Sequence, residues 1–169
     1  MMPPAIEIAD VPKRERERLL PILEESFEGL YLWHARRTLH SIEVVRAART
    51  AEEEDAGLVM LKTIAEGAGY VYYVAVPPSF RRRGIGGMLL DDAVSYFERQ
   101  GARDVYASVP EDNVESKTLF GSRGFERITG SDMAERYGRV RALLMYREMM
   151  VVRGELLLGK RLEAGARLT

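Results

Sequence analysis

Residues 70–100 carry the pattern that most limits how this chain can fold: a strand, a basic glycine-rich turn and an amphipathic helix in direct succession. Residues 70–76 are aromatic or β-branched apart from one alanine, with glycines before them and prolines after, as expected of a strand. Residues 88–100 repeat apolar side chains at helical spacing, namely Leu89, Leu90, Ala93, Tyr96 and Phe97. The turn between them holds three arginines and three glycines.

The turn at residues 77–87 is suited to a phosphate group. A glycine-rich connection from strand to helix exposes unpaired backbone N–H groups at the positive end of the helix dipole. No lysine follows the glycines, as a P-loop requires, and Leu89 stands where a dinucleotide fingerprint needs its third glycine. The pattern that remains is Arg/Gln-x-x-Gly-x-Gly/Ala, met by Arg81, Gly84 and Gly86. The alternative is that this basic turn is only a solvated connection and binds no phosphate.

A second motif lies at residues 113–125, Asn-Val-Glu-Ser-Lys-Thr-Leu-Phe-Gly-Ser-Arg-Gly-Phe. Asn113 is placed to cap a short helix and Gly124 to end it. The two motifs, in this order and separated by one helix and one strand, resemble the GNAT superfamily of acetyl-CoA-dependent N-acetyltransferases. The superfamily pattern is Asn-x-x-Ala-x-x-Leu-Tyr-x-x-x-Gly-Phe. Asn113, Leu119, Gly124 and Phe125 match it, with Ser116 at the small position and Phe120 at the tyrosine position.

The resemblance implies an α/β fold with a mixed, mostly antiparallel twisted sheet of about six to seven strands flanked by helices. It places a single acyltransferase domain at residues 1–150. It also implies acetyl-CoA as co-substrate, entering where the strands at residues 70–76 and 104–109 splay. Main-chain groups of Val74 and Val76 would hold the pantetheine arm. The coenzyme-binding residues implied are Val74, Val76, Arg81, Arg82, Arg83, Gly84, Ile85, Gly86, Gly87, Asn113, Ser116 and Phe120.

The side chains for acid–base chemistry depart from the family pattern. Phe120 stands where many members have the tyrosine that protonates the leaving thiolate, and phenylalanine has no proton to give. Ser108 stands at the position of a glutamate base in the ribosomal-protein-acetylating branch, and Tyr70 at that of a glutamate base in the histone-acetylating branch. No acid–base pair carries over. The catalytic candidates are the backbone N–H of Val74, as the donor to the thioester carbonyl, and Tyr70.

The function implied is transfer of an acetyl or small acyl group from acyl-CoA to an amine, by direct attack in a ternary complex. The acceptor is left open among small amines, amino acids and protein N-termini. A degenerate acyl-CoA-binding module with a regulatory or assembly role is the alternative, suggested by Phe120 and Ser108. A nucleotide-phosphate site on a Rossmann-like sheet is a third possibility, disfavoured by Leu89 and by the hairpins expected before the turn.

The stretch at residues 30–37 contains the single tryptophan, Trp33, at the expected junction of two helices. We interpret Tyr31 and Trp33 as one wall of the acceptor pocket, a role that this junction commonly has in the superfamily. The alternative is that these rings cap the core between the helices. His34 and His40 are interpreted as surface or structural residues.

The pattern before residue 70 predicts a short first strand, two helices and two further strands. Asp10 is a candidate N-cap for an amphipathic helix at residues 13–27, which Pro21 should kink or split. Residues 43–49 and 57–64 are expected to form successive antiparallel strands.

The pattern after residue 125 predicts two closing antiparallel strands, at residues 126–129 and 141–148, joined by a polar loop at 130–139. Residues 151–169 exceed what such a fold needs. We expect them to be an extension whose apolar residues pack on the domain or on a second subunit, which makes a homodimer possible.

Composition excludes several classes of protein. With 169 residues, 46% of them hydrophobic and 30% charged, the chain suits one globular domain. A net charge of −1 argues against a general nucleic-acid binder. No apolar run reaches membrane-spanning length and no signal-peptide core is present, so we expect a cytoplasmic protein without a membrane partner. The absence of cysteine and the presence of only two histidines argue against a catalytic thiol and a metal site.

Overall fold

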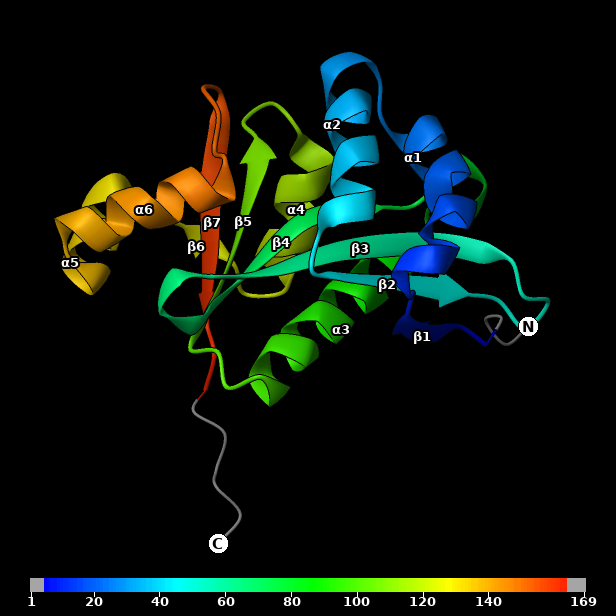
Figure 1. Ribbon diagram of the computed structural model, residues 1–169, viewed down its shortest axis with the longest axis horizontal. Coiled ribbons are helices and arrows are strands. Elements are labelled where there is room, and N and C mark those ends of the chain that lie inside the picture. Colours follow the sequence, from blue (N-terminus) through cyan, green and yellow to red (C-terminus); the bar gives the residue numbers. More distant parts are fainter. Residues whose placement is uncertain (1–4, 164–169) are drawn as a thin grey trace, which may run out of the picture. The chain divides into compact units, whose positions relative to one another are not determined.

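The computed structural model describes residues 5–163, apart from the side chain of Glu66, as an α/β structure (Figure 1). The described residues form strands hydrogen-bonded in the order β1-β2-β3-β4-β5-β7-β6. The strands are β1 Glu7–Asp10, β2 Val44–Arg49, β3 Asp55–Ile64, β4 Ala68–Ala75, β5 Asp104–Pro110, β6 Glu126–Arg127 and β7 Glu155–Arg161. The α-helices are α1 Leu20–Ser26, α2 Gly29–Ser41, α3 Ile85–Arg99, α4 Val114–Ser122, α5 Gly130–Tyr137 and α6 Arg139–Met149. The predicted fold class is confirmed.

Short 3-10 helices complete the description: η1 Lys13–Leu19, η2 Ala65–Gly67 and η3 Pro78–Phe80. The pairs β1–β2, β2–β3, β5–β7 and β6–β7 are antiparallel, and β4–β5 is parallel.

By its internal contacts the chain divides into two compact units. The first consists of Met1–Lys62 and Tyr73–Ala93, and the second of Thr63–Tyr72 and Val94–Thr169.

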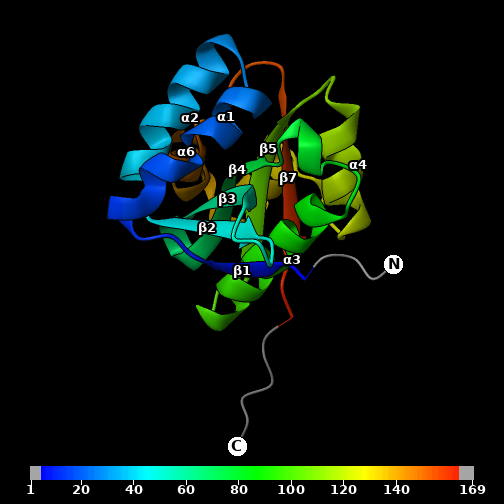
Figure 2. The same ribbon diagram turned by 90° about the vertical axis from the view of Figure 1, so that its right-hand side faces the viewer.

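In the first unit, helices cover both sides of β2 and β3. Figure 2 shows α1 and α2 on one side and the start of α3 on the other. Gly57 on β3 lies directly under α3, and a Cβ atom there would come within 2.9 Å of the Leu89 side chain. Real Cβ contacts essentially never come so close, so the glycine is what allows α3 to approach the strand at this point.

A buried arginine fixes the helices of the first unit. Arg16 is 3% exposed, and its guanidinium donates to the carbonyl oxygens of Leu39 and Ile42, at 3.0 and 2.8 Å. These carbonyls belong to the last turn of α2 and the residue after it, where backbone acceptors lack intrahelical partners and carry partial negative charge. Burial lowers the pKa of Arg16. Its charge is therefore satisfied by main-chain oxygens at the end of α2 and just after it.

The start of the first unit agrees with the prediction in one respect and departs from it in another. The predicted break at Pro21 is confirmed, because η1 ends at Leu19 and α1 begins at Leu20, with the proline in the first turn. The prediction that Asp10 caps a helix is wrong. Asp10 is the last residue of β1, opposite Arg46 on β2, and its carboxylate accepts a hydrogen bond from that arginine at 2.8 Å.

In the second unit, the predicted strand at residues 141–148 and the polar loop before it are wrong. Both segments are helical and form α5 and α6, which lie next to each other beside β6 and β7 (Figure 1). α6 buries Ala142, Met145 and Met149, which are spaced as one face of a helix, whereas Leu143 and Leu144 are exposed. Apolar residues on both faces obscured the helical period in the sequence.

The strand that closes the sheet comes from the segment predicted to be an extension. Residues 155–161 form β7, which lies between β5 and β6 and is antiparallel to both. A Cβ atom at Gly159 would come within 2.8 Å of the Tyr106 ring, so the glycine makes room for that ring. The prediction that residues 151–169 exceed what the fold needs is therefore wrong for β7, which is a strand of the sheet itself. Residues 164–169 lie outside the described residues, and the homodimer stays a prediction.

Within residues 5–163, no helix has the length and apolar character needed to cross a membrane. In the same part of the chain, no three His, Asp or Glu side chains converge as metal ligands.

Candidate active site

The basic turn connects the end of β4 to the start of α3 in the first unit. η3 forms one tight turn after β4, and the Arg81 guanidinium donates to the carbonyl oxygen of Val76 at 3.0 Å. Arg82 and Gly84 have positive φ angles of 61° and 77°. A left-handed arginine costs about 1–2 kcal/mol, and such strain is often found at ligand-binding turns. The turn is thus held in a defined, locally strained conformation.

The turn presents charged side chains to solvent, next to the backbone donors of a helix start. Arg81, Arg82, Arg83 and Gly84 are all exposed. The N–H of Met88 donates to the carbonyl of Gly84 at 3.0 Å, as the first turn of α3 closes. The N–H groups of residues 85–87 precede this bond and have no acceptor within the helix. Cationic side chains around such donors suit a pyrophosphate, the group predicted here.

The second motif forms α4 as predicted. The Asn113 side chain accepts a hydrogen bond from the N–H of Ser116 at 3.0 Å, which confirms the N-cap, and Gly124 follows the helix with φ 81°. Phe120 is 5% exposed, and its ring packs edge-to-face on Phe125 at 5.1 Å. Phe120 thus has a packing role in the second unit.

Tyr70 and Ser108, the two positions where family branches have a glutamate base, contact each other. Their hydroxyl oxygens are 2.8 Å apart, and Tyr70 is 2% exposed. Burial raises the pKa of Tyr70. A phenol in this state stays protonated at neutral pH, so Tyr70 suits a hydrogen-bond donor better than a general base.

Another tyrosine of β4, Tyr73, connects the strand to α2. In the first unit, the Tyr73 hydroxyl lies 2.8 Å from Nδ1 of His34, and its ring packs edge-to-face on Phe27 at 5.2 Å. This half-buried pair joins β4 to α2, in agreement with the structural role expected of His34. His40 is exposed at the other end of α2.

Tyr31 and Trp33 lie on α2 and are 44% and 54% exposed. The Arg37 guanidinium lies over the Trp33 ring at 5.0 Å from its centre. About half of each ring is thus open to solvent. They are accessible to a ligand, as their predicted role in acceptor binding requires.

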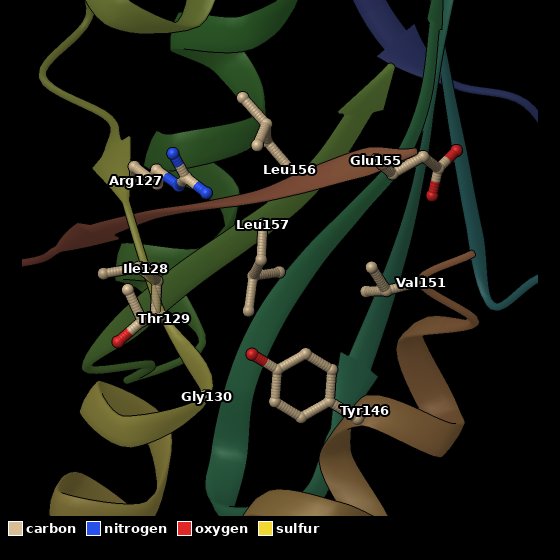
Figure 3. Close-up of a pocket in the computed structure, with 9 residues that line it drawn as sticks. All are labelled: Arg127, Ile128, Thr129, Gly130, Tyr146, Val151, Glu155, Leu156 and Leu157. Carbon is tan, nitrogen blue, oxygen red and sulfur yellow. The ribbon is translucent and has the colours of Figure 1, made fainter. Parts of the chain in front are cut away.

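The second unit contains a pocket of about 250 Å³ that the sequence did not indicate (Figure 3). Its lining residues come from the end of β6, the start of α5, α6 and the start of β7: Arg127, Ile128, Thr129, Gly130, Tyr146, Val151, Glu155, Leu156 and Leu157. Glu155 is the acidic residue among them, and it was missed because an isolated glutamate before a leucine run carries no local signal. Only the register of β7 brings it to this pocket.

Comparison with known proteins now identifies the family. Residues 12–125 match the family model described as Acetyltransferase (GNAT) family. The chain belongs to this family. The two motifs at residues 77–87 and 113–125 lie within the matched region.

Individual relatives agree with this placement. The [ribosomal protein bS18]-alanine N-acetyltransferase of Salmonella typhimurium is 30% identical over 80 residues, covering 47% of this chain and 53% of that protein. The mycothiol acetyltransferase of Geodermatophilus obscurus is 36% identical over 62 residues, covering 37% of this chain and 20% of that protein. The matched segments thus span about half or less of these relatives. The PaiA N-acetyltransferase of Thermoplasma acidophilum, solved in complex with coenzyme A, shares the fold, with a TM-score of 0.69, 16% identity and coverage of 94% of this chain and 99% of that one.

Proposed function

We propose that this protein is an N-acetyltransferase that moves an acetyl or small acyl group from acetyl-CoA to an amine by direct attack in a ternary complex. The observation that carries the proposal is the turn from β4 to α3, where exposed arginines surround the unpaired N–H groups of a helix start. It lies within the region that matches the GNAT family. Relatives that acetylate a protein alanine and mycothiol support acyl transfer as the chemistry.

In this proposal the coenzyme is bound mainly by backbone groups. The N–H groups at Gly86 and Gly87 and the side chains of Arg82 and Arg83 would bind the pyrophosphate. The main chain of Val74 and Val76 would bind the pantetheine arm like an added strand. The N–H of Val74 would donate to the thioester carbonyl, and a donor fixed in this way contributes about 3 kcal/mol to transition-state stabilisation.

The reaction needs little else from the protein. The amine nitrogen attacks the thioester carbon, the C–N bond forms, the C–S bond breaks, and coenzyme A leaves as a thiol. Phe120 has no proton for that thiolate and is packed on Phe125. Because a coenzyme A thiol is a fair leaving group, transfer does not require an acid at this position. Tyr31 and Trp33, both accessible on α2, are proposed to contact the acceptor.

Two measurements test the proposal. Acetyl-CoA should raise the melting temperature, and NAD should not, because Leu89 replaces the glycine that a dinucleotide site needs. Free thiol should then be released from acetyl-CoA in the presence of at least one amine of a panel of amino acids, small amines and peptides. Stabilisation by NAD alone would contradict the coenzyme assignment.

A degenerate acyl-CoA-binding module is the second candidate. It is favoured by one observation, that Phe120 and Ser108 occupy the acid and base positions and are both engaged in internal contacts. It predicts binding of acetyl-CoA with no thiol release across the same panel.

A further inference from the structure

Helix α6 carries apolar side chains on two opposite sides. The inner side packs into the core of the second unit and consists of Ala142, Met145 and Met149, each 4% exposed or less. Because an α-helix has about 3.6 residues per turn, the residues that face the other way are Val140, Leu143 and Leu144. They are 74%, 71% and 49% exposed, and we call them the outer stripe of α6. A single exposed leucine is ordinary, whereas three apolar side chains at helical spacing form a continuous surface.

The outer stripe belongs to a segment that the connection between strands does not need. β6 and β7 are antiparallel neighbours, with Arg127 opposite Leu158. Strands paired in this way can be joined by a turn of about two residues. Here residues 128–154 lie between them and include α5 and α6, beside the two strands (Figure 1). The inner side of α6 completes the core, and its outer side is left to solvent.

The surface around the outer stripe is positively charged. Exposed arginines lie at both ends of α6 and in the turn that follows it, namely Arg139, Arg141, Arg147 and Arg153. The acidic residue of this segment, Glu148, is half-buried and accepts a hydrogen bond from the N–H of Ala65 at 2.9 Å. Four arginines and one glutamate give residues 139–153 a net charge of +3, in a chain whose net charge is −1. Met150 and Val152, both more than half exposed, extend the apolar surface into the turn.

These features indicate the chemistry of a partner. The outer stripe is a ridge, because it lies on the side of the helix opposite to the core, and it suits a partner into which side chains can insert. An anionic lipid surface accommodates both parts, since apolar side chains enter the boundary between headgroups and acyl chains while arginines contact lipid phosphates.

A second copy of the chain fits this surface less well. Two-fold pairing through the outer stripe would bring the arginines of both copies together. Three side chains also fall short of the roughly 800 Å² per partner that a stable interface buries. Charge and area therefore both favour the lipid surface.

We propose that α6 binds the surface of an anionic lipid bilayer, with Val140, Leu143 and Leu144 inserted beneath the headgroups and the surrounding arginines on lipid phosphates. The contact involves one leaflet and needs no membrane-spanning segment, which no helix of residues 5–163 could provide. The expectation of a protein without a membrane partner was based on spanning length and on signal peptides, which do not bear on a contact of this kind. The proposal goes beyond acetyl transfer and does not depend on it.

The test uses the full chain and lipid vesicles of two compositions, pure phosphatidylcholine and an equal mixture of phosphatidylcholine and phosphatidylglycerol. Sedimentation with vesicles should show that the parent protein binds the mixed vesicles at least about 10-fold more tightly, because several arginines contact anionic headgroups. This preference should decrease as the salt concentration is raised from about 0.05 to 0.5 M, because the ions screen these charges.

Leu143→Ser tests the apolar part of the contact. It should lower the affinity for mixed vesicles about 10-fold, because the side chain that leaves water on binding is lost. Leu30→Ser is the matched control, because Leu30 is also exposed, at 78%, and lies on a different helix, α2. It should bind the vesicles like the parent. Both variants should melt near the temperature of the parent, because exposed residues contribute little to stability.

Arg139→Gln combined with Arg147→Gln tests the charges. The affinity for mixed vesicles should fall about 25-fold, because each arginine near an anionic surface contributes about 5-fold. Arg14→Gln combined with Arg99→Gln is the matched control, since it removes the same charge from exposed arginines outside α6. That control should lower the affinity by less than about 2-fold.

Three outcomes would overturn the proposal. The first is a parent protein that does not prefer the mixed vesicles, and the second is a preference that survives in both α6 variants, since the lipid would then be bound elsewhere, such as at the turn at residues 77–87. The third is a parent that sediments as a dimer without lipid and a Leu143→Ser variant that sediments as a monomer, because the outer stripe would then be covered by a second copy. A parent that binds the vesicles as expected but releases no thiol from acetyl-CoA supports the lipid contact and contradicts the proposed acetyl transfer.

Discussion

The Tyr137 hydroxyl donates a hydrogen bond to the Asp104 carboxylate at 2.8 Å, which joins the last residue of α5 to the first residue of β5. Asp104 is 5% exposed and also accepts from the Arg136 guanidinium at 2.8 Å. The segment predicted to be a polar loop is therefore attached to the sheet through a buried, fully engaged carboxylate.

Tyr137→Phe should lower the free energy of unfolding by about 1–3 kcal/mol, because it removes a donor from a buried acceptor. Burial raises the pKa of Tyr137 above the value of about 10 that it has in the unfolded chain. The associated stability is thus fully present below pH 10 and is lost as the pH rises above it. When unfolding by urea is measured from about pH 7 to 11, the free energy of unfolding should fall less in Tyr137→Phe than in the parent. Tyr31→Phe, at a half-exposed ring, is the control, and equal alkaline curves for the parent and Tyr137→Phe would contradict the prediction.

Gly86→Val should abolish acetyl-CoA binding while the fold survives, because a branched side chain in the first turn of α3 blocks the approach of the pyrophosphate to the backbone N–H groups. Calorimetric titration and the melting temperature measure the two effects separately. Gly121→Val is the matched control, at a helical glycine whose Cβ would meet nothing within 4 Å. Unchanged affinity in Gly86→Val would show that the pyrophosphate binds elsewhere.

Trp33→Ala should raise the KM of the acceptor or lower kcat, with the Kd of acetyl-CoA near that of the parent. Because Trp33 is 54% exposed, the free energy of unfolding should change by about 0.5 kcal/mol or less. Leu30→Ala, on the same helix and 78% exposed, is the control. A large loss of stability in Trp33→Ala without a specific effect on the acceptor would argue against recognition by this ring.

Phe120→Leu should leave the pH profile of kcat almost unchanged, because a phenyl ring does not titrate. It should lower the free energy of unfolding by about 1 kcal/mol through the lost contact with Phe125. Phe120→Tyr should leave turnover unchanged or raise it by restoring a proton donor. If the pH dependence of kcat were lost in Phe120→Leu, the prediction would be contradicted, because Phe120 would then affect a neighbouring group that titrates.

The parts of the fold that sequence could predict are those whose patterns are local. Residues 70–76 and 88–100 have a clear period and clear turn residues on both sides, and β4 and α3 form there. The cap at Asn113 depends on residues three positions apart, and it too was predictable. Each of these signals lies within one element or its ends.

The errors come from long-range relationships. Leu143 and Leu144 made residues 141–148 resemble a strand, although the buried stripe of α6 lies on its other face. Nothing local showed that the leucines of β7 would pair with β5, or that Gly159 would make room for Tyr106. Glu155 was missed for the same reason, because its place in the pocket of the second unit depends on strand register.

The position of β7 also sets the order in which the protein can be assembled during translation. β6 leaves the ribosome before β7, yet β7 is the strand that pairs with both β5 and β6. Until residue 161 has been made, β5 lacks its antiparallel neighbour on this edge of the sheet. A nascent chain that stops after α6 therefore contains both family motifs and still exposes an open edge of β5 to other chains.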